Sequence, residues 1–167
     1  MLWILLLIPI GVAIWCWYPA SPLPKGAVIN KLVVYKSKRK MEAYSGTDLI
    51  KVYDIALGKN PVGHKEFEGD NKTPEGTYII NDRNPHSGYH KNLGISYPNE
   101  TDKDYAEKLG KSPGGHIKIH GLPNGKGYIG KLHYQRDWTA GCIAVTNDEI
   151  DELYEAVNKN SVIQILP

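Results

Sequence analysis

Short runs of alternating apolar and polar residues, separated by turn residues, occupy much of the chain after its first 30 positions. An alternation with a period of two is typical of strands that bury one face, and short apolar runs between turn residues indicate strands as well. Strands are therefore predicted over residues 31–35, 41–44, 49–56, 77–80, 93–97 and 161–166. The polar stretch 64–72 is predicted to be a loop.

Two segments have helical features instead. Residues 101–109 begin with polar residues, and Gly110 follows the expected last turn. The second helix follows a capping-box sequence at 146–149, after which apolar residues recur three and four positions apart as far as Val157. Short strands, Gly and Pro turns and two helices together predict a mainly β fold with helices, arranged as a sandwich or a barrel.

The first 18 residues differ from the rest of the chain because none of them is charged. As a helix they would span roughly 27 Å, about the thickness of a bilayer core. Aromatic residues end this stretch, as they do at membrane interfaces, and the residues that follow form a poor signal-peptidase site. We expect an uncleaved transmembrane anchor over 1–18, a proline-rich linker over 19–28 and a domain over 29–167.

The overall composition narrows the classes of function. The chain has 167 residues, 41% of them hydrophobic, and a net charge of +2 with acidic and basic residues interspersed. This composition is typical of a globular domain and gives no electrostatic drive towards nucleic acid. Its two cysteines do not make a disulfide framework, and Cys16 lies in the apolar first segment, so Cys142 is expected to be a free thiol.

The surroundings of Cys142 suggest chemistry. Ala140 and Gly141 precede it and would let a substrate backbone approach the sulfur, with the amides of Gly141 and Cys142 free to bind an oxyanion. A thiol nucleophile needs a base, and His116 and His120 would share one face of a strand. Taken alone, the cysteine is equally compatible with core packing and the histidines with backbone hydrogen bonds.

Other residues near this motif allow a binding role. Arg83 and Arg136 lie in expected loops that flank it, and an arginine clamps a carboxylate well; the alternative is an ordinary surface charge. Trp138 and Tyr97 would form an apolar wall of the site, or simply pack in the core.

A zinc site is a minor alternative. Its ligands would be His116, His120, His133 and Cys142. Their spacing matches no compact zinc signature, so no metal is expected.

Taken together, these residues resemble the L,D-transpeptidase catalytic domain of the YkuD type over 29–167. The resemblance rests on Thr73-Pro74-Glu75-Gly76-Thr77-Tyr78, Ile95-Ser96-Tyr97-Pro98-Asn99, His120-Gly121 and Asp137-Trp138-Thr139-Ala140-Gly141-Cys142-Ile143-Ala144. The last of these resembles a branch with both cross-link-forming and cross-link-cleaving members.

The resemblance implies a β-sandwich-like catalytic domain in which Cys142 is the nucleophile. His120 would take up and return the proton, the Gly121 carbonyl would orient its ring, and the amides of Gly141 and Cys142 would bind the oxyanion. Candidates for substrate binding are Arg83, Tyr97, His116, Trp138 and Thr139. The substrate would be a peptidoglycan stem peptide, held as a thioester and released to an amine of the cell wall or of a lipoprotein, or to water. No cofactor is implied.

Two departures from the family pattern leave the reaction open. Ala140 stands where most members have a second histidine, and Ala144 where many have an arginine. The alternatives are an L,D-transpeptidase, a hydrolase of the same kind (an L,D-carboxypeptidase or a cutter of existing links), a non-catalytic wall-binding module and the zinc protein. A further hypothesis is that His133 partly replaces the missing histidine.

The expected location follows from the substrate. The lysines after the apolar segment favour a cytoplasmic domain, but a folded domain often crosses a membrane regardless of such charge. Because peptidoglycan lies outside the cytoplasm, we expect a single-pass protein of the bacterial inner membrane with its domain on the periplasmic face.

Overall fold

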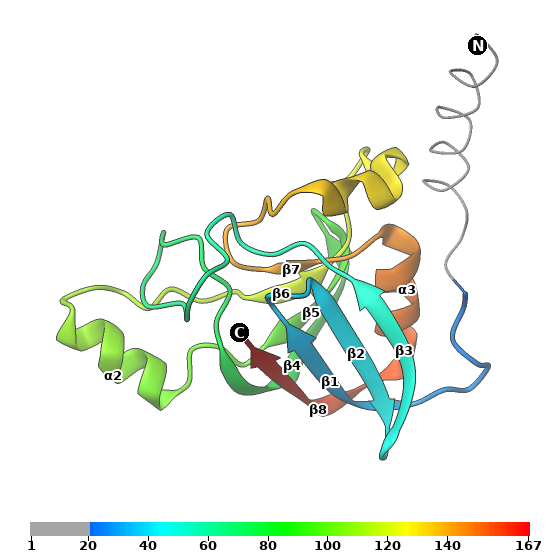
Figure 1. The fold of residues 1–167 in the computed structure, drawn as a ribbon, viewed down its shortest axis with the longest axis horizontal. Coiled ribbons are helices and arrows are strands. Elements are labelled where there is room, and N and C mark those ends of the chain that lie inside the picture. Colours follow the sequence, from blue (N-terminus) through cyan, green and yellow to red (C-terminus); the bar gives the residue numbers. More distant parts are fainter. Residues whose placement is uncertain (1–20) are drawn as a thin grey trace, which may run out of the picture.

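The computed structural model describes residues 21–167 (Figure 1). Eight strands form one sheet in the order β3-β2-β1-β8-β4-β5-β6-β7. The strands are β1 (Ile29–Tyr35), β2 (Lys40–Ser45), β3 (Asp48–Asp54), β4 (Gly76–Ser87), β5 (His90–Ile95), β6 (Lys118–His120), β7 (Ile143–Ala144) and β8 (Val157–Leu166). The helices are α2 (Glu100–Lys108), α3 (Asn147–Ala156) and the 3-10 helix η1 (Gly127–Gln135).

The predicted transmembrane anchor over 1–18 lies outside the described residues. Within residues 21–167, no helix is long and apolar enough to cross a membrane.

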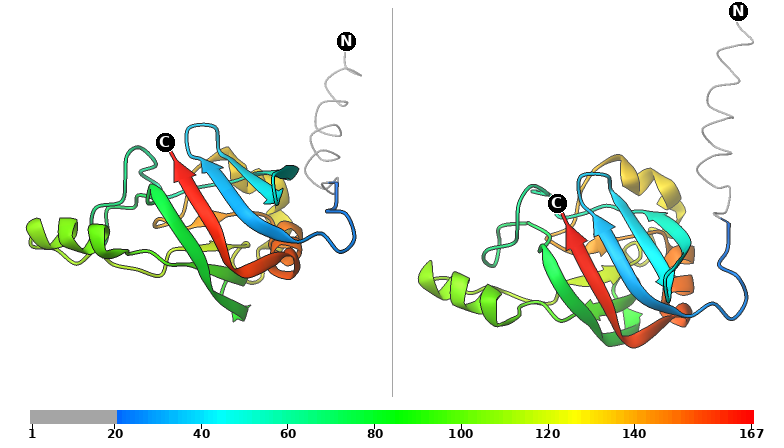
Figure 2. Two further views of the ribbon diagram at one scale, coloured as in Figure 1. Left: turned by 90° about the horizontal axis from the view of Figure 1, so that it is seen from below. Right: turned by 60° about the horizontal axis from the view of Figure 1, so that its bottom comes forward.

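The sheet is mixed, and its longest strand joins its two halves. β1 pairs with β2 antiparallel and with β8 parallel, so the first and last strands of the domain lie side by side (Figure 2). β4 pairs with β8 through its first residues and with β5 through the rest, with a register shift after Ile80. The mainly β prediction is confirmed, but the strands form one curled sheet in place of the two separate sheets of a sandwich.

The core lies inside the curl of the sheet. Alternation along β1 turns Leu32 and Val34 inward, and both are fully buried. The largest buried side chains from the other elements include Met41, Tyr53, Ile80, Leu93, Ile119 and Ile143. Burial of each large aliphatic side chain contributes roughly 1.5–3 kcal/mol, so this cluster supplies most of the stability of the domain.

Helix α3 closes one side of the core against β5 and β6. Its capping box is present as predicted: the Thr146 hydroxyl accepts from the Glu149 amide, and the Glu149 carboxylate accepts from the Thr146 amide. Ile150 and Leu153, which begin the apolar stripe, are fully buried, and Tyr154 is partly buried. Helix α2 instead projects away from the sheet (Figure 1). Both predicted helices are confirmed within one or two residues.

Candidate active site

The parallel pair β6 and β7 brings the predicted nucleophile and base to one face of the sheet. Ile119 is opposite Ile143, so Cys142, just before β7, is next to Lys118, while His120 ends β6. Alternate residues of a strand share a face, and the side chains of Lys118, His120 and Cys142 all line one cavity of about 530 Å³. The cavity is further lined by Lys59, Asn84, Ser87, Gly88, Tyr89, Asn92, His116, Trp138, Thr139 and Ala140.

The His120 ring is held from three sides. Its Nδ1 lies 2.7 Å from the Gly121 carbonyl oxygen. Because a carbonyl only accepts, Nδ1 carries the proton and Nε2 is left as the basic nitrogen. Tyr89 packs on the imidazole with ring centroids 4.6 Å apart, and Trp138 meets it edge-on at 5.6 Å. Burial lowers the pKa of His120, so the ring is neutral at physiological pH.

The Cys142 thiol is also neutral in this resting structure. Its Sγ donates to the His116 carbonyl oxygen at 3.6 Å. Burial raises the pKa of the thiol, while the backbone amide of Lys118 and the ammonium groups of Lys118 and Lys65 act in the opposite direction and only reduce the shift. The pair is therefore a thiol and a neutral imidazole, and the proton must move to His120 when the sulfur attacks.

Thr139 shapes the loop that carries the nucleophile. Its hydroxyl donates to the Cys142 carbonyl at 2.7 Å and accepts from the Gly141 amide at 3.1 Å. The Gly141 amide is thus bound within its own loop, which differs from its predicted place in an oxyanion hole. The Cys142 amide remains the candidate oxyanion donor from this loop.

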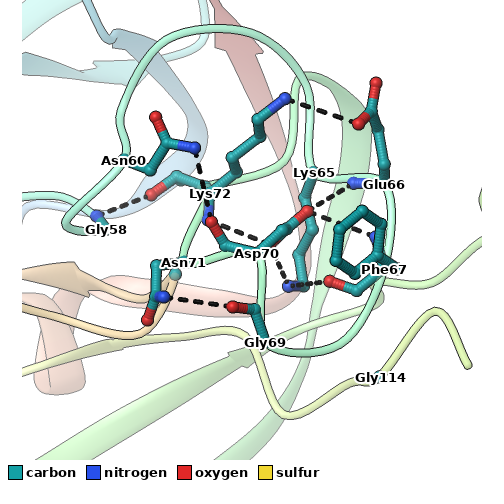
Figure 3. A network of polar contacts seen from close by, with 12 residues as sticks. Gly58, Asn60, Lys65, Glu66, Phe67, Gly69, Asp70, Asn71, Lys72 and Gly114 are labelled. Carbon is teal, nitrogen blue, oxygen red and sulfur yellow. Dashed lines mark hydrogen bonds and ion pairs between the residues drawn. The ribbon is translucent and has the colours of Figure 1, made fainter.

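Behind the nucleophile lies the loop between β3 and β4, which is organised by one buried carboxylate. Asp70 accepts hydrogen bonds from the Lys65 ammonium and from the backbone amides of Glu66, Phe67 and Lys72 (Figure 3). Burial alone would raise the pKa of Asp70, but the ammonium and the three amides outweigh it, and the pKa is lowered. The carboxylate therefore stays charged and holds the turn together.

This turn places the Lys72 carbonyl against the nucleophile loop and the Asn71 carbonyl against Gly58, which lies beside that loop. A Cβ on Gly141 would lie 2.7 Å from the Lys72 carbonyl oxygen, and one on Gly58 would lie 2.2 Å from that of Asn71. Gly141 also has a φ of +133°, which favours glycine. Next to it, the Gly58 amide donates to the Thr73 hydroxyl at 3.0 Å. The backbone before Cys142 is thus packed between two segments of the preceding loop and has little freedom to move.

Comparison with known proteins places this geometry in a family. The family model of the YkuD L,D-transpeptidase catalytic domain matches residues 29–165. The chain belongs to this family.

Relatives with names and solved structures support the assignment. YafK of Escherichia coli K12, provisionally named an L,D-transpeptidase, is 29% identical over 131 residues, 74% of this chain and 45% of YafK. The helical cell shape determining protein Pgp2 of Campylobacter jejuni superposes with a TM-score of 0.60 at 25% identity, over 87% of this chain and 50% of Pgp2. Bd1075 of Bdellovibrio bacteriovorus gives 0.56 at 25% identity, over 86% and 49%. The chain spans about half the length of these relatives.

More distant members share the fold. An L,D-transpeptidase from Mycobacterium smegmatis superposes with a TM-score of 0.54 at 15% identity, over 85% of this chain and 60% of that chain. The curled mainly β sheet described above is therefore that of the L,D-transpeptidase domain.

Of the predicted substrate-binding residues, Trp138, Thr139 and His116 line the cavity of this L,D-transpeptidase domain. His116 does so from outside the strand that was expected, because its φ of +57° breaks the extended backbone before β6. Its carbonyl, and not its ring, contacts the Cys142 sulfur.

The structure corrects the predicted places of Arg83 and Tyr97, neither of which lines the cavity. Arg83 lies in β4, and its guanidinium donates to the carbonyls of Tyr154 and Val157 at the end of α3. Tyr97 is 5% exposed, and its hydroxyl donates to the Pro113 carbonyl at 2.9 Å. Each of these two side chains is therefore hydrogen-bonded to backbone carbonyls of the domain itself.

His133 and Arg136 lie on the other side of Trp138, around a second cavity of about 260 Å³. The Trp138 indole donates to His133 Nδ1 at 3.4 Å, and burial lowers the pKa of His133 to about 4. His133 thus contacts a wall of the catalytic cavity without lining that cavity. The four residues of the zinc alternative do not gather either: within residues 21–167 there is no group of three or more His, Cys, Asp or Glu placed to hold a metal ion.

Several residues of the cavity escape the sequence reasoning, and two of them, Tyr89 and Asn92, lie next to His120. Tyr89 lies in the turn between β4 and β5 and packs on His120. Asn92 lies in β5 directly opposite His120. An asparagine at a position that should be apolar in a buried strand was the one available signal for Asn92, whereas nothing in the local sequence indicates Tyr89.

Proposed function

We propose that this domain is a cysteine L,D-transpeptidase that acts on peptidoglycan stem peptides through a Cys142 thioester. The observation that carries the proposal is that Cys142 and His120 line one open cavity, with His120 Nδ1 bound to the Gly121 carbonyl and Nε2 left as the base. The family match and the cell-shape role in the name of Pgp2 support a substrate in the cell wall.

The reaction has two halves. In the first, His120 Nε2 takes the thiol proton while Sγ attacks the peptide carbonyl, and the developing oxyanion is bound by the Cys142 amide. The imidazolium then gives its proton to the departing amine, which leaves a thioester. In the second half an incoming amine attacks the thioester, its proton passes through His120 back to the sulfur, and a new amide is released.

Water that enters in place of the amine would make the same site a hydrolase, either an L,D-carboxypeptidase or a cutter of existing links. This second function is supported by Ala140, which lines the cavity at a position where most of the family has a second histidine. A small side chain leaves more room for water beside the thioester.

The test is mass spectrometry of the full chain in detergent, incubated with disaccharide-tetrapeptide with and without an added amine. Loss of the terminal D-alanine together with a new amide would support the transpeptidase, and loss to water alone the hydrolase. If neither a tetrapeptide nor a cross-linked wall fragment changes, and Cys142 carries no acyl group, the proposal is wrong. Cys142→Ala serves as the inactive control.

We also propose that residues 1–18 anchor the protein in the bacterial inner membrane with the domain on the periplasmic face, where its substrate lies. The uncharged first segment and the resemblance to wall enzymes support this location. Protease added to intact spheroplasts should digest the domain. Protection until the membrane is lysed would place the domain in the cytoplasm and contradict the proposal.

A further inference from the structure

One buried polar group in the catalytic cavity has no partner. Asn92 is 4% exposed and lines the cavity, and within residues 21–167 its Oδ1 meets no hydrogen-bond donor. A buried carbonyl oxygen without a donor is unfavourable, and native structures leave few such atoms. A hydrogen-bond donor on the bound substrate would satisfy this oxygen and remove the unfavourable free energy.

The position of Asn92 relative to His120 indicates which group this is. The two residues are directly paired across β5 and β6, so their side chains lie on the same face, with Cβ atoms about 4.5–5.5 Å apart. Leu93 and Ile119, the next residues along, are fully buried in the core, which confirms that the Asn92 and His120 side chains face the opposite, cavity side.

The row of paired residues continues into the next strand. Asn84 in β4 is opposite Asn92, and it lines the same cavity. The Asn84 Oδ1 already accepts from the His86 amide at 2.8 Å. Of the two carboxamides, that of Asn84 thus has a donor for its oxygen, whereas that of Asn92, beside His120, does not.

We propose that Asn92 is a substrate-binding residue whose carboxamide oxygen accepts an N–H from the amine that leaves or enters at the Cys142 thioester. The proposal rests on the proposed function and deepens it. The nitrogen of that amine must stand next to His120, because His120 exchanges a proton with it. An amine that is hydrogen-bonded to the imidazole still has a second N–H. A buried acceptor on the neighbouring strand would bind that N–H. With both hydrogens bound, the lone pair of the nitrogen points towards the carbonyl carbon.

The step balances without any further reactant. The entering amine forms a bond to the thioester carbonyl carbon, the carbon–sulfur bond breaks with its electron pair on Sγ, and the amine proton passes through His120 to the sulfur. Asn92 keeps its own protons throughout. A water molecule that replaces the amine also keeps a second O–H after it engages His120, so the same oxygen can orient it. The Asn92 oxygen is therefore expected to assist departure of the amine and attack by either nucleophile.

The experiment compares Asn92→Leu, which has a similar volume and no acceptor, with Asn92→Asp, which keeps an acceptor oxygen. The full chain is given disaccharide-tetrapeptide and glycinamide as the amine, and D-alanine release and the ratio of amide to free acid are measured. In Asn92→Leu we expect kcat/KM for D-alanine release to fall about tenfold, as the loss of one buried hydrogen bond predicts, with the amide and acid products reduced alike. Asn92→Asp should keep most of the release rate. If the parent uses water alone, D-alanine release is the readout.

Alkylation of Cys142 by iodoacetamide is measured in parallel and should not change in Asn92→Leu, which separates the loss of the acceptor from damage to the nucleophile. Asn81→Leu, an exposed position on the same sheet, is the matched control. An unchanged release rate in a folded Asn92→Leu would overturn the inference and leave an ordered water as the partner of the oxygen. Asn92→Ala, which also lacks an acceptor, replaces Asn92→Leu if that variant does not fold. An inactive parent would instead overturn the proposed function.

Discussion

At the scale of single residues, the site combines a nucleophile and a base that are both uncharged at rest. Burial raises the pKa of Cys142 and lowers that of His120, so the charged pair of a thiolate and an imidazolium is disfavoured. The proposed reaction therefore depends on moving a proton at the moment of attack, and the reactivity of Cys142 without substrate should be low.

We expect iodoacetamide to alkylate Cys142 slowly at pH 7, at a rate that is still rising with pH at pH 9, because the thiolate is the reactive form and the pKa of the thiol is raised. Mass spectrometry of the peptide that contains Cys142 measures this rate without interference from Cys16. Rapid alkylation at pH 6 would indicate a preformed ion pair and contradict this account.

Replacement of His120 should lower kcat/KM strongly, whereas replacement of His116 should lower it only slightly. His120→Ala is expected to lose at least about 100-fold in kcat/KM, which is common when a general base is removed. His116→Ala keeps the backbone carbonyl that contacts the sulfur, so its loss should be less than about tenfold. Steady-state release of D-alanine measures both. A larger loss for His116→Ala than for His120→Ala would reverse the assignment of the base.

The activity of the parent should also persist below the ordinary histidine pKa. Because burial lowers the pKa of His120, the neutral, active form of the ring survives as the pH falls through 6.5. The acid limb of kcat/KM should lie below that value, as measured from pH 4 to 9. An acid limb above pH 7 would show that another group controls activity.

At the scale of elements, the sequence predicts the regular parts of the fold and misses the irregular ones. The alternation in β1 and the capping box of α3 are local signals, and these two elements lie within two residues of their predicted bounds, whereas β8 begins four residues before the predicted strand 161–166. The second half of β4 is polar and contains Pro85, so it lacks a strand pattern and is strand only because it pairs with β5. The glycines of η1 hide its helical turns, and β7 has only two residues.

The same distinction holds for the site. Cys142 and His120 were predicted because their immediate neighbours carry the signal. Asn92 and Tyr89 reach the cavity only through the pairing of β5 with β6 and the turn before it, which no short stretch of sequence records.

The loop between β3 and β4 gives a prediction at this scale. Asp70→Asn replaces an acceptor oxygen by an amide group that meets a backbone donor, and it neutralises the partner of the buried Lys65. We expect a loss of about 1–3 kcal/mol in the free energy of unfolding and a lower kcat, because the turn supports the backbone at Gly141. Urea unfolding followed by circular dichroism measures the first.

The matched control is Asp54→Asn, which breaks the exposed pair with Lys40 and should change stability by less than about 0.5 kcal/mol. Equal changes in stability and kcat for the two substitutions would contradict the idea that the loop supports the nucleophile.

At the scale of the whole molecule, buried neutral histidines make the fold sensitive to acid. The pKa of His133 is lowered by burial to about 4, whereas the unfolded chain titrates near 6.5. Above pH 6.5 neither state binds the proton and the full stability is present. As the pH falls from 6.5 to 4 only the unfolded state is protonated, so stability is lost, by roughly 3 kcal/mol for this residue. His120 acts in the same direction.

We therefore expect the free energy of unfolding of the parent to be lower at pH 4.5 than at pH 7. His133→Gln, which keeps an acceptor for the Trp138 indole, should show a smaller difference between these two pH values. Urea titrations at both values measure it. An identical pH dependence in the parent and His133→Gln would mean that His133 is protonated or exposed in the folded protein.

The place of β8 in the sheet has a consequence for biosynthesis. β8 is the last strand of this domain to be synthesised, yet it lies between β1 and β4 and links strands β1 to β3 with strands β4 to β7. Until it emerges, β1 and β4 each present an unpaired edge, and the two groups of strands have no common backbone partner. The sheet therefore cannot be completed before β8 has been synthesised, and up to that point β1 and β4 lack the backbone hydrogen bonds that they form with it.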